Sequence, residues 1–118
     1  MIKNISKRKL NRGASHRVAT LRNLATNLIK YGMIRTTDAK AKELKRYIQH
    51  LISRIKKTEP EFNKYRVANM FLSTKDASEK LIKVIIPRYN EINSGYVKTA
   101  ILGNRKGDNA KIVAIKFK

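Results

Sequence analysis

The chain has 118 residues, 42% of them hydrophobic, which is enough for one domain with a modest core and too short for two. Its 28 Lys and Arg against 8 Asp and Glu give a formal net charge of +20, and self-repulsion of that size indicates a polyanionic partner such as nucleic acid. No apolar run approaches the roughly 20 residues that cross a bilayer, and the absence of Cys excludes disulfides and thiolate chemistry.

The positive charge is concentrated toward the N-terminus. Residues 1–57 contain 16 basic and 2 acidic residues, whereas residues 58–118 contain 12 basic and 6 acidic residues. Residues 1–13 have no hydrophobic periodicity and include five cations, so they are predicted to form a basic extended arm. Residues 14–118 are predicted to form a single α+β RNA-binding domain.

A first helix is predicted to begin with Ser15 as its N-cap and to end at Gly32. Between them, apolar residues recur at helical spacing, at Val18, Leu21, Ala25 and Leu28. Residues 33–37 follow as a short extended piece. The pattern therefore predicts a helix that buries one side, followed directly by a strand.

A second helix is predicted after Thr36 or Thr37, either of which is a suitable N-cap, with Asp38 placed to interact with the helix dipole. Its apolar stripe is Ala41, Leu44, Ile48, Leu51 and Ile55. Pro60 suits the first turn of a third helix. The predicted buried side of that third helix consists of Tyr65, Ala68 and Leu72.

A fourth segment, residues 76–86, is ambiguous. Ala77, Leu81, Val84 and Ile85 favour a helix, but the β-branched run at 81–86 is also compatible with a strand. Pro87 is expected to limit either element.

The C-terminal part changes to the alternating period of strands. Val97, Thr99 and Ile101 form one alternating run, and Val113, Ile115 and Phe117 form another, with a turn-rich loop at 103–110 between them. The prediction is an antiparallel hairpin with residues 33–37 as a third strand. The expected fold is a two-layer α+β domain, with N-terminal helices packed on a small three-stranded sheet.

Catalytic chemistry is not indicated. His16 would need a carboxylate to orient it, and no acid precedes Asp38, while His50 is interpreted as a solvated or partly packed helix residue. Two distant His and no Cys cannot supply a zinc site, and the glycines do not form a phosphate loop. No enzyme activity, metal or cofactor is expected.

The cations of the hairpin loop and the aromatic residues bear on how RNA would be recognised. The Arg105-Lys106 pair lies at the hairpin loop, where a plain turn and a cationic finger that contacts RNA backbone are about equally supported. Most aromatic residues occur at core spacing, with Tyr31 and Tyr96 as exceptions. Recognition is therefore expected to rest on shape and phosphate contacts with folded RNA.

Several blocks of sequence together resemble one family. Leu10-Asn11-Arg12 with Ser15-His16-Arg17 and Arg22-Asn23 is similar to the opening signature of the bacterial-type large-subunit ribosomal protein seventeen family. The segment 34–44, containing Thr36-Thr37 and Lys40-Ala41-Lys42-Glu43-Leu44, resembles its second block. Gly95-Tyr96 and Gly107-Asp108-Asn109-Ala110 resemble its closing hairpin.

This resemblance implies a structural protein of the large ribosomal subunit that binds folded large-subunit rRNA near the nascent-chain exit side. The implied partners are that rRNA and neighbouring ribosomal proteins, including protein thirty-two, with no membrane or small-molecule substrate. The implied location is the ribosome of the bacterial cytoplasm or of an organelle. The alternative function is a free-standing nucleic-acid-binding regulator or nucleoid protein, which would need a groove-reading helix.

The hypothesis for the site combines the resemblance with the charge pattern and the helix N-termini, which present N–H groups to phosphate. The predicted RNA-binding residues are Lys3, Lys7, Arg8, Lys9, Asn11, Arg12, Ser15, His16, Arg17, Arg22, Asn23, Arg35, Thr36, Thr37, Lys40, Lys42, Arg105 and Lys106.

Overall fold

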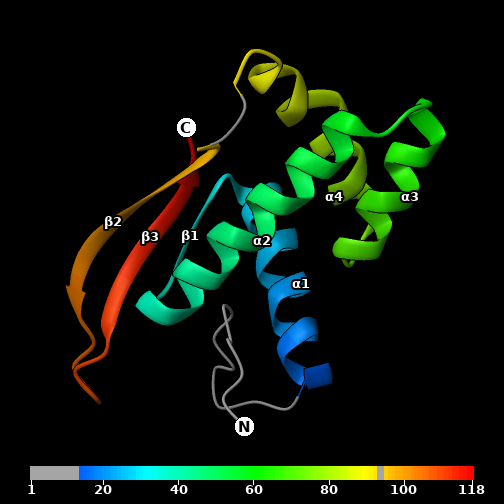
Figure 1. Ribbon diagram of the computed structural model, residues 1–118. Coiled ribbons are helices and arrows are strands. Elements are labelled where there is room, and N and C mark those ends of the chain that lie inside the picture. Colours follow the sequence, from blue (N-terminus) through cyan, green and yellow to red (C-terminus); the bar gives the residue numbers. More distant parts are fainter. Residues whose placement is uncertain (1–13, 93–94) are drawn as a thin grey trace, which may run out of the picture.

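The computed structural model describes residues 14–92 and 95–118, so the predicted arm at 1–13 lies outside the described residues. The described chain folds as helices on one side of a three-stranded sheet (Figure 1). The helical elements are α1 (Ala14–Tyr31), α2 (Asp38–Lys57), α3 (Glu61–Phe71), α4 (Lys75–Lys80), a π-helical turn η1 (Leu81–Ile85) and a 3₁₀ helix η2 (Ile86–Tyr89). The strands are β1 (Met33–Thr37), β2 (Val97–Asn104) and β3 (Lys111–Phe117). The predicted α+β class is confirmed.

Helix α1 begins two residues earlier than predicted, because an N-cap at Ser15 would make His16 the first helical residue. Ala14 is its first residue, so Ser15 lies in the first turn and its prediction as the N-cap is wrong. Alanine has the highest helix propensity, which favours its inclusion in the helix. The predicted stripe is buried at Leu21, Ala25 and Leu28, but Val18 is 50% exposed and does not belong to the core.

Helix α2 is the central element of the core. All five residues of its predicted stripe are buried, together with Ile52. The helix contacts all three strands as well as α1 and α3. Its i, i+3, i+7 pattern therefore places one apolar face where the helices and the sheet meet.

The ambiguous fourth segment is helical. α4 runs into η1, which ends at Ile85 just before Pro87, so this proline limits the segment as expected, and the chain continues as the separate 3₁₀ helix η2 with Pro87 in its first turn. The wider π-helical turn changes which residues face inward: Leu81, Ile82, Ile85 and Ile86 are buried, whereas Val84 is 44% exposed. The strand alternative is wrong.

The sheet has the strand order β1-β3-β2, and both pairs are antiparallel. Ile34 of β1 and Thr99 of β2 both lie opposite Ile115 of β3, which is fully buried in the core. Residues directly opposite share a face of the sheet, and neighbours along a strand alternate between faces. This register therefore sets one face of the sheet against the helices, and among the described residues no helix covers the other face, which is called the open face below.

The end of the β2–β3 hairpin extends beyond the helical layer (Figure 1). Every residue of β2 after Val97 is exposed, including Ile101 at 67% and Leu102 at 52%. A bulge lies between Ile101 and Gly103, where the register with β3 shifts. The hairpin is thus fixed to the core at its base and exposed toward its tip.

A lysine joins α2 to the segment that leads into the sheet. The Lys56 ammonium donates hydrogen bonds to the carbonyl oxygens of Tyr89, at 2.7 Å, and Ile92. It also lies 5.3 Å from the centre of the Tyr96 ring, which is buried. Tyr96, considered from its sequence as an exception to core spacing, is therefore a core residue.

Replacing Lys56→Met is expected to lower the free energy of unfolding by about 2 kcal/mol, because hydrogen bonds from a charged donor to two carbonyls are lost. Lys57→Met, at the next and exposed position, is the control and should change stability by less than about 0.5 kcal/mol. Urea unfolding of both variants checks this. Equal stabilities for the two would show that the Lys56 contacts contribute little.

Candidate nucleic-acid interface

The residues predicted on α1 divide into exposed and half-buried positions. His16 and Asn23 are exposed, and Arg17 and Arg22 are half-buried. Ser15 lies in the first turn of the helix. The predicted arm residues lie outside the described part of the chain: Lys3, Lys7, Arg8, Lys9, Asn11 and Arg12.

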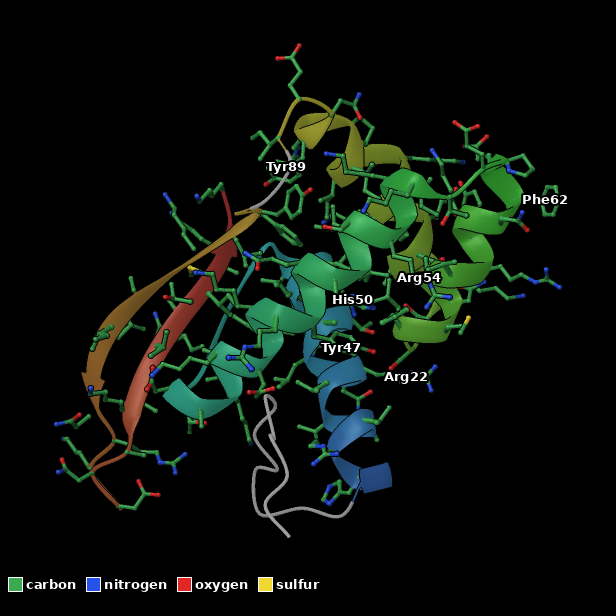
Figure 2. All side chains as sticks on the ribbon, in the orientation of Figure 1. Arg22, Tyr47, His50, Arg54, Phe62 and Tyr89 are labelled. Carbon is green, nitrogen blue, oxygen red and sulfur yellow. The ribbon has the colours of Figure 1, made fainter. Side chains whose placement is uncertain are left out.

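Arg22 and Asn23 contact other parts of the protein. The Nη2 atom of Arg22 donates a hydrogen bond to the Leu72 carbonyl at 3.0 Å, so this side chain joins α1 to the end of α3 (Figure 2). The Asn23 Oδ1 atom accepts a hydrogen bond from the Ser73 hydroxyl at 2.9 Å. Both residues thus position α1 against the α3–α4 connection, and their contact with RNA stays a prediction.

The second predicted group lies where β1 passes directly into α2. Arg35 is exposed, whereas Thr36, Thr37 and Lys40 are half-buried. Thr37 is the N-cap of α2, as predicted, but its side chain makes no capping hydrogen bond. The Thr37 side chain therefore does not accept hydrogen bonds from the first N–H groups of α2. At a helix N-terminus, these are the groups that donate hydrogen bonds to a bound phosphate.

The two acids near this group do little to reduce its positive charge. Asp38 is paired with Lys42 at 3.2 Å. Glu43 is only 3% exposed and lies 3.9 Å from Arg46. Residues 14–57 contain eleven Lys and Arg but only these two acids. The described N-terminal half is therefore strongly cationic, which is the electrostatic pattern of a nucleic-acid-binding surface.

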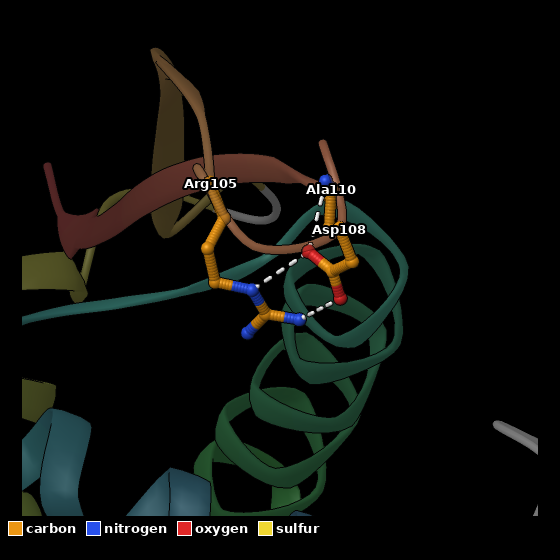
Figure 3. A network of polar contacts seen from close by, with 3 residues as sticks. All are labelled: Arg105, Asp108 and Ala110. Carbon is orange, nitrogen blue, oxygen red and sulfur yellow. Dashed lines mark hydrogen bonds and ion pairs between the residues drawn. The ribbon is translucent and has the colours of Figure 1, made fainter.

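The hairpin tip differs from the simple cationic pair suggested by its sequence. Arg105 forms a bidentate ion pair with Asp108, with Nε to Oδ1 at 2.9 Å and Nη2 to Oδ2 at 2.5 Å (Figure 3). The Asp108 carboxylate also accepts a hydrogen bond from the Ala110 N–H at 3.2 Å. Lys106 is exposed. The arginine thus shapes the turn, so of the two cations Lys106 is better placed to contact a ligand.

Asp108 is expected to titrate at an unusually low pH. Its hydrogen bond with Arg105 is the main cause and the Ala110 N–H adds to it, so the pKa of Asp108 falls from 3.8 to about 2. Because the folded-state pKa is depressed, the contact is fully present above pH 4 and is lost as the pH falls through about 2. Carboxyl ¹³C chemical shifts would measure the midpoint. Arg105→Ala should move it back toward 3.8, and an unchanged midpoint would show that this ion pair does not form in solution.

A half-open cavity of about 400 Å³ between α1, α2 and α3 was not anticipated from the sequence. It is lined by Leu21, Glu43, Arg46, Tyr47, His50 and Phe71. The Tyr47 hydroxyl donates a hydrogen bond to the Phe71 carbonyl at 2.7 Å, and burial raises the pKa of Tyr47 to about 12.

The Phe71 ring is also in contact with charged and aromatic side chains of α2. The ring of His50 lies 5.8 Å from it on an exposed position of α2, in agreement with the prediction of a solvated or partly packed helix residue, and Arg54 lies over the Phe71 ring at 5.8 Å (Figure 2). These contacts hold α3 against α2.

Within the described residues, no group of three or more His, Cys, Asp or Glu is placed to hold a metal ion. No helix of the same residues is long and apolar enough to cross a membrane. The arrangement that remains is a cationic surface on α1, β1 and the start of α2, with a hairpin extending from the sheet.

Comparison with known proteins decides the family. The family model described as ribosomal protein L17 matches residues 20–118. The chain belongs to the ribosomal protein L17 family. As a member of the L17 family it is a ribosomal protein, with a structural rather than a catalytic role.

Relatives from bacteria and from a eukaryote support this assignment. The large ribosomal subunit protein bL17 of Campylobacter lari is 41% identical over 110 residues, covering 93% of this chain and 92% of that protein. The bL17 protein of Endomicrobium trichonymphae is 39% identical over 117 residues, covering 99% and 98%. The bL17m protein of Schizosaccharomyces pombe is 39% identical over 118 residues, covering 99% of this chain and 57% of that protein.

The L17 assignment confirms the resemblance stated from the sequence blocks. The model match begins at Thr20 and includes the β1–α2 junction and the closing hairpin. The predicted contacts from Lys3 to Arg17 lie before the match, and all of the predicted RNA contacts, inside the match or before it, stay predictions.

Proposed function

We propose that this L17-family chain is a structural constituent of the large ribosomal subunit that binds and stabilises folded large-subunit rRNA. The cationic half of the chain supplies phosphate contacts, and the fixed arrangement of α1, β1 and α2 supplies recognition of shape. The observation that supports this most is that residues 14–57 contain eleven cations and two acids, of which Asp38 is paired to Lys42 and Glu43 is buried. Charge of this kind is neutralised by RNA phosphates.

The proposal extends to the surroundings of the protein. We also propose a position near the nascent-chain exit side of the subunit, among neighbouring ribosomal proteins that include protein thirty-two, as the resemblance of the sequence blocks implies. The contacts with RNA are assigned to the eighteen predicted residues, with Arg22, Asn23 and Arg105 also maintaining the protein's own structure.

A competition experiment distinguishes this proposal from a free-standing DNA-binding regulator. The full chain is bound to protein-free large-subunit rRNA labelled with a fluorophore, and unlabelled duplex DNA or unlabelled rRNA is added at equal phosphate concentration. We expect rRNA to compete at a concentration at least tenfold lower than DNA, because the surface is suited to a folded RNA shape. Equal or better competition by duplex DNA would favour the regulator.

A further inference from the structure

The open face of the sheet contains two lysines that lie side by side. Lys98 of β2 is directly opposite Lys116 of β3, and both are exposed. Directly opposite residues have Cβ atoms about 5 Å apart, and like charges in such a pair destabilise the sheet. The free protein therefore keeps an unfavourable contact at this point.

No acid on the sheet relieves this repulsion. The three described strands contain four cations and no Asp or Glu. A further cation, Arg35, lies opposite Ala114, which is two residues along β3 from Lys116 and therefore on the same face. Three cations thus share one face of a small sheet.

The surface beside these cations is hollowed, and two of the residues that line the hollow are alanines. Ala114 lies opposite Ala100 of β2, and both line a hollow of about 390 Å³. Lys98 and Lys116 also line it, as do Met33 and Leu102. An alanine side chain is short, so a ligand in the hollow can approach the β2 backbone at the exposed Ala100, next to Ala114, which is 8% exposed, and between the two exposed lysines.

We infer that this open face is a second RNA-binding surface, on which one sugar-phosphate strand of the rRNA lies over Ala100 and Ala114 with its phosphates between Lys98 and Lys116. Charge complementarity identifies the ligand, because a polyanion removes the repulsion between the two lysines. Phe117 is the one aromatic residue of the described strands, and it lies opposite Val97 on the other face, so the open face is proposed to contact backbone and not bases.

This inference rests on the proposed RNA-binding function and adds a surface to it. Arg35 connects the two surfaces, because it lies on β1 just before the α2 N-terminus and also on the open face. RNA bound to the β1–α2 junction would reach the lysine pair without crossing the helical layer.

The test is a double variant, Lys98→Gln with Lys116→Gln, in the full chain. Removing the repulsion should raise Tm by about 2 °C, since a cross-strand pair contributes a few tenths of a kcal/mol. Affinity for protein-free large-subunit rRNA at 0.1 M salt should fall roughly 10- to 100-fold, and the slope of log affinity against log salt should become shallower by about 2. A variant that raises Tm but lowers RNA affinity shows that the two lysines act in binding and not in stabilising the fold.

The matched control is Lys64→Gln with Arg66→Gln on α3, which lies away from the sheet (Figure 1) and loses the same charge. It should leave Tm unchanged and affect the salt slope less. A second variant, Lys116→Glu, creates an opposite-charge pair with Lys98, so it should also raise Tm while weakening RNA binding.

The outcomes separate this inference from the proposed function. If the sheet variant binds rRNA no more weakly than the α3 control, or if its Tm falls, the inference is overturned. Normal rRNA binding combined with failure to enter large subunits would assign the face to a neighbouring protein and overturn it too. If the unmodified chain itself does not bind rRNA, the proposed function fails, and this inference fails with it.

Discussion

Raising the salt concentration from 50 to 200 mM is expected to weaken binding of this chain to protein-free large-subunit rRNA by roughly 10³-fold or more. The charge of +20 lets the protein neutralise an estimated 6–10 phosphates, and each neutralised phosphate releases condensed counterions to the solution. The release is less favourable when salt is already abundant. Fluorescence titrations at four or more salt concentrations would give the slope of log affinity against log salt.

A paired variant connects this slope to the interface. Arg35→Gln with Lys40→Gln removes two cations at the β1–α2 junction and should make the slope shallower by about 2. Lys64→Gln with Arg66→Gln on α3 removes equal charge and is expected to have a smaller effect. A nearly flat slope for the unmodified chain would mean that its basic half is solvated and not bound to phosphate.

Leu44→Ala is expected to lower the free energy of unfolding by about 3 kcal/mol, within the range of about 2–5 kcal/mol for large-to-small core changes. Leu44 is fully buried on α2, in the core where the helices and sheet meet. The substitution removes apolar contacts and leaves a cavity there. Thermal and urea unfolding would measure the loss.

Leu102→Ala is the matched control, because it makes the same chemical change on β2 at a side chain that is 52% exposed. It should change the free energy of unfolding by less than about 0.5 kcal/mol. If both substitutions cost the same, the hairpin would be more buried in solution than the structure shows, and the account of the open sheet face would be wrong.

The sequence predicted those parts of the fold in which one hydrophobic period dominates. The α2 stripe from Ala41 to Ile55 and the alternating runs at 97–101 and 113–117 are confirmed. The segment at 81–86 could not be assigned, because a run of β-branched residues fits both periods. Only packing against the other helices selects the π-helical turn.

Less of the candidate site could be predicted from the sequence, because the partners of its side chains come from distant parts of the chain or from turn geometry. The ion pair of Arg105 and the hydrogen bond from Arg22 to Leu72 depend on turn and tertiary geometry. The Lys98–Lys116 pair depends on the exact register of β2 with β3, and the bulge after Ile101 shifts that register further along the hairpin. Charge counting located the basic half but not these partners.

The most direct test of the central claim is the position of a tagged copy of the full chain in a ribosome sedimentation gradient at cellular salt concentration. We expect the protein to sediment with the large subunit and with whole ribosomes, and ribonuclease treatment to release it. Recovery only in the slowly sedimenting fractions at the top of the gradient would contradict it.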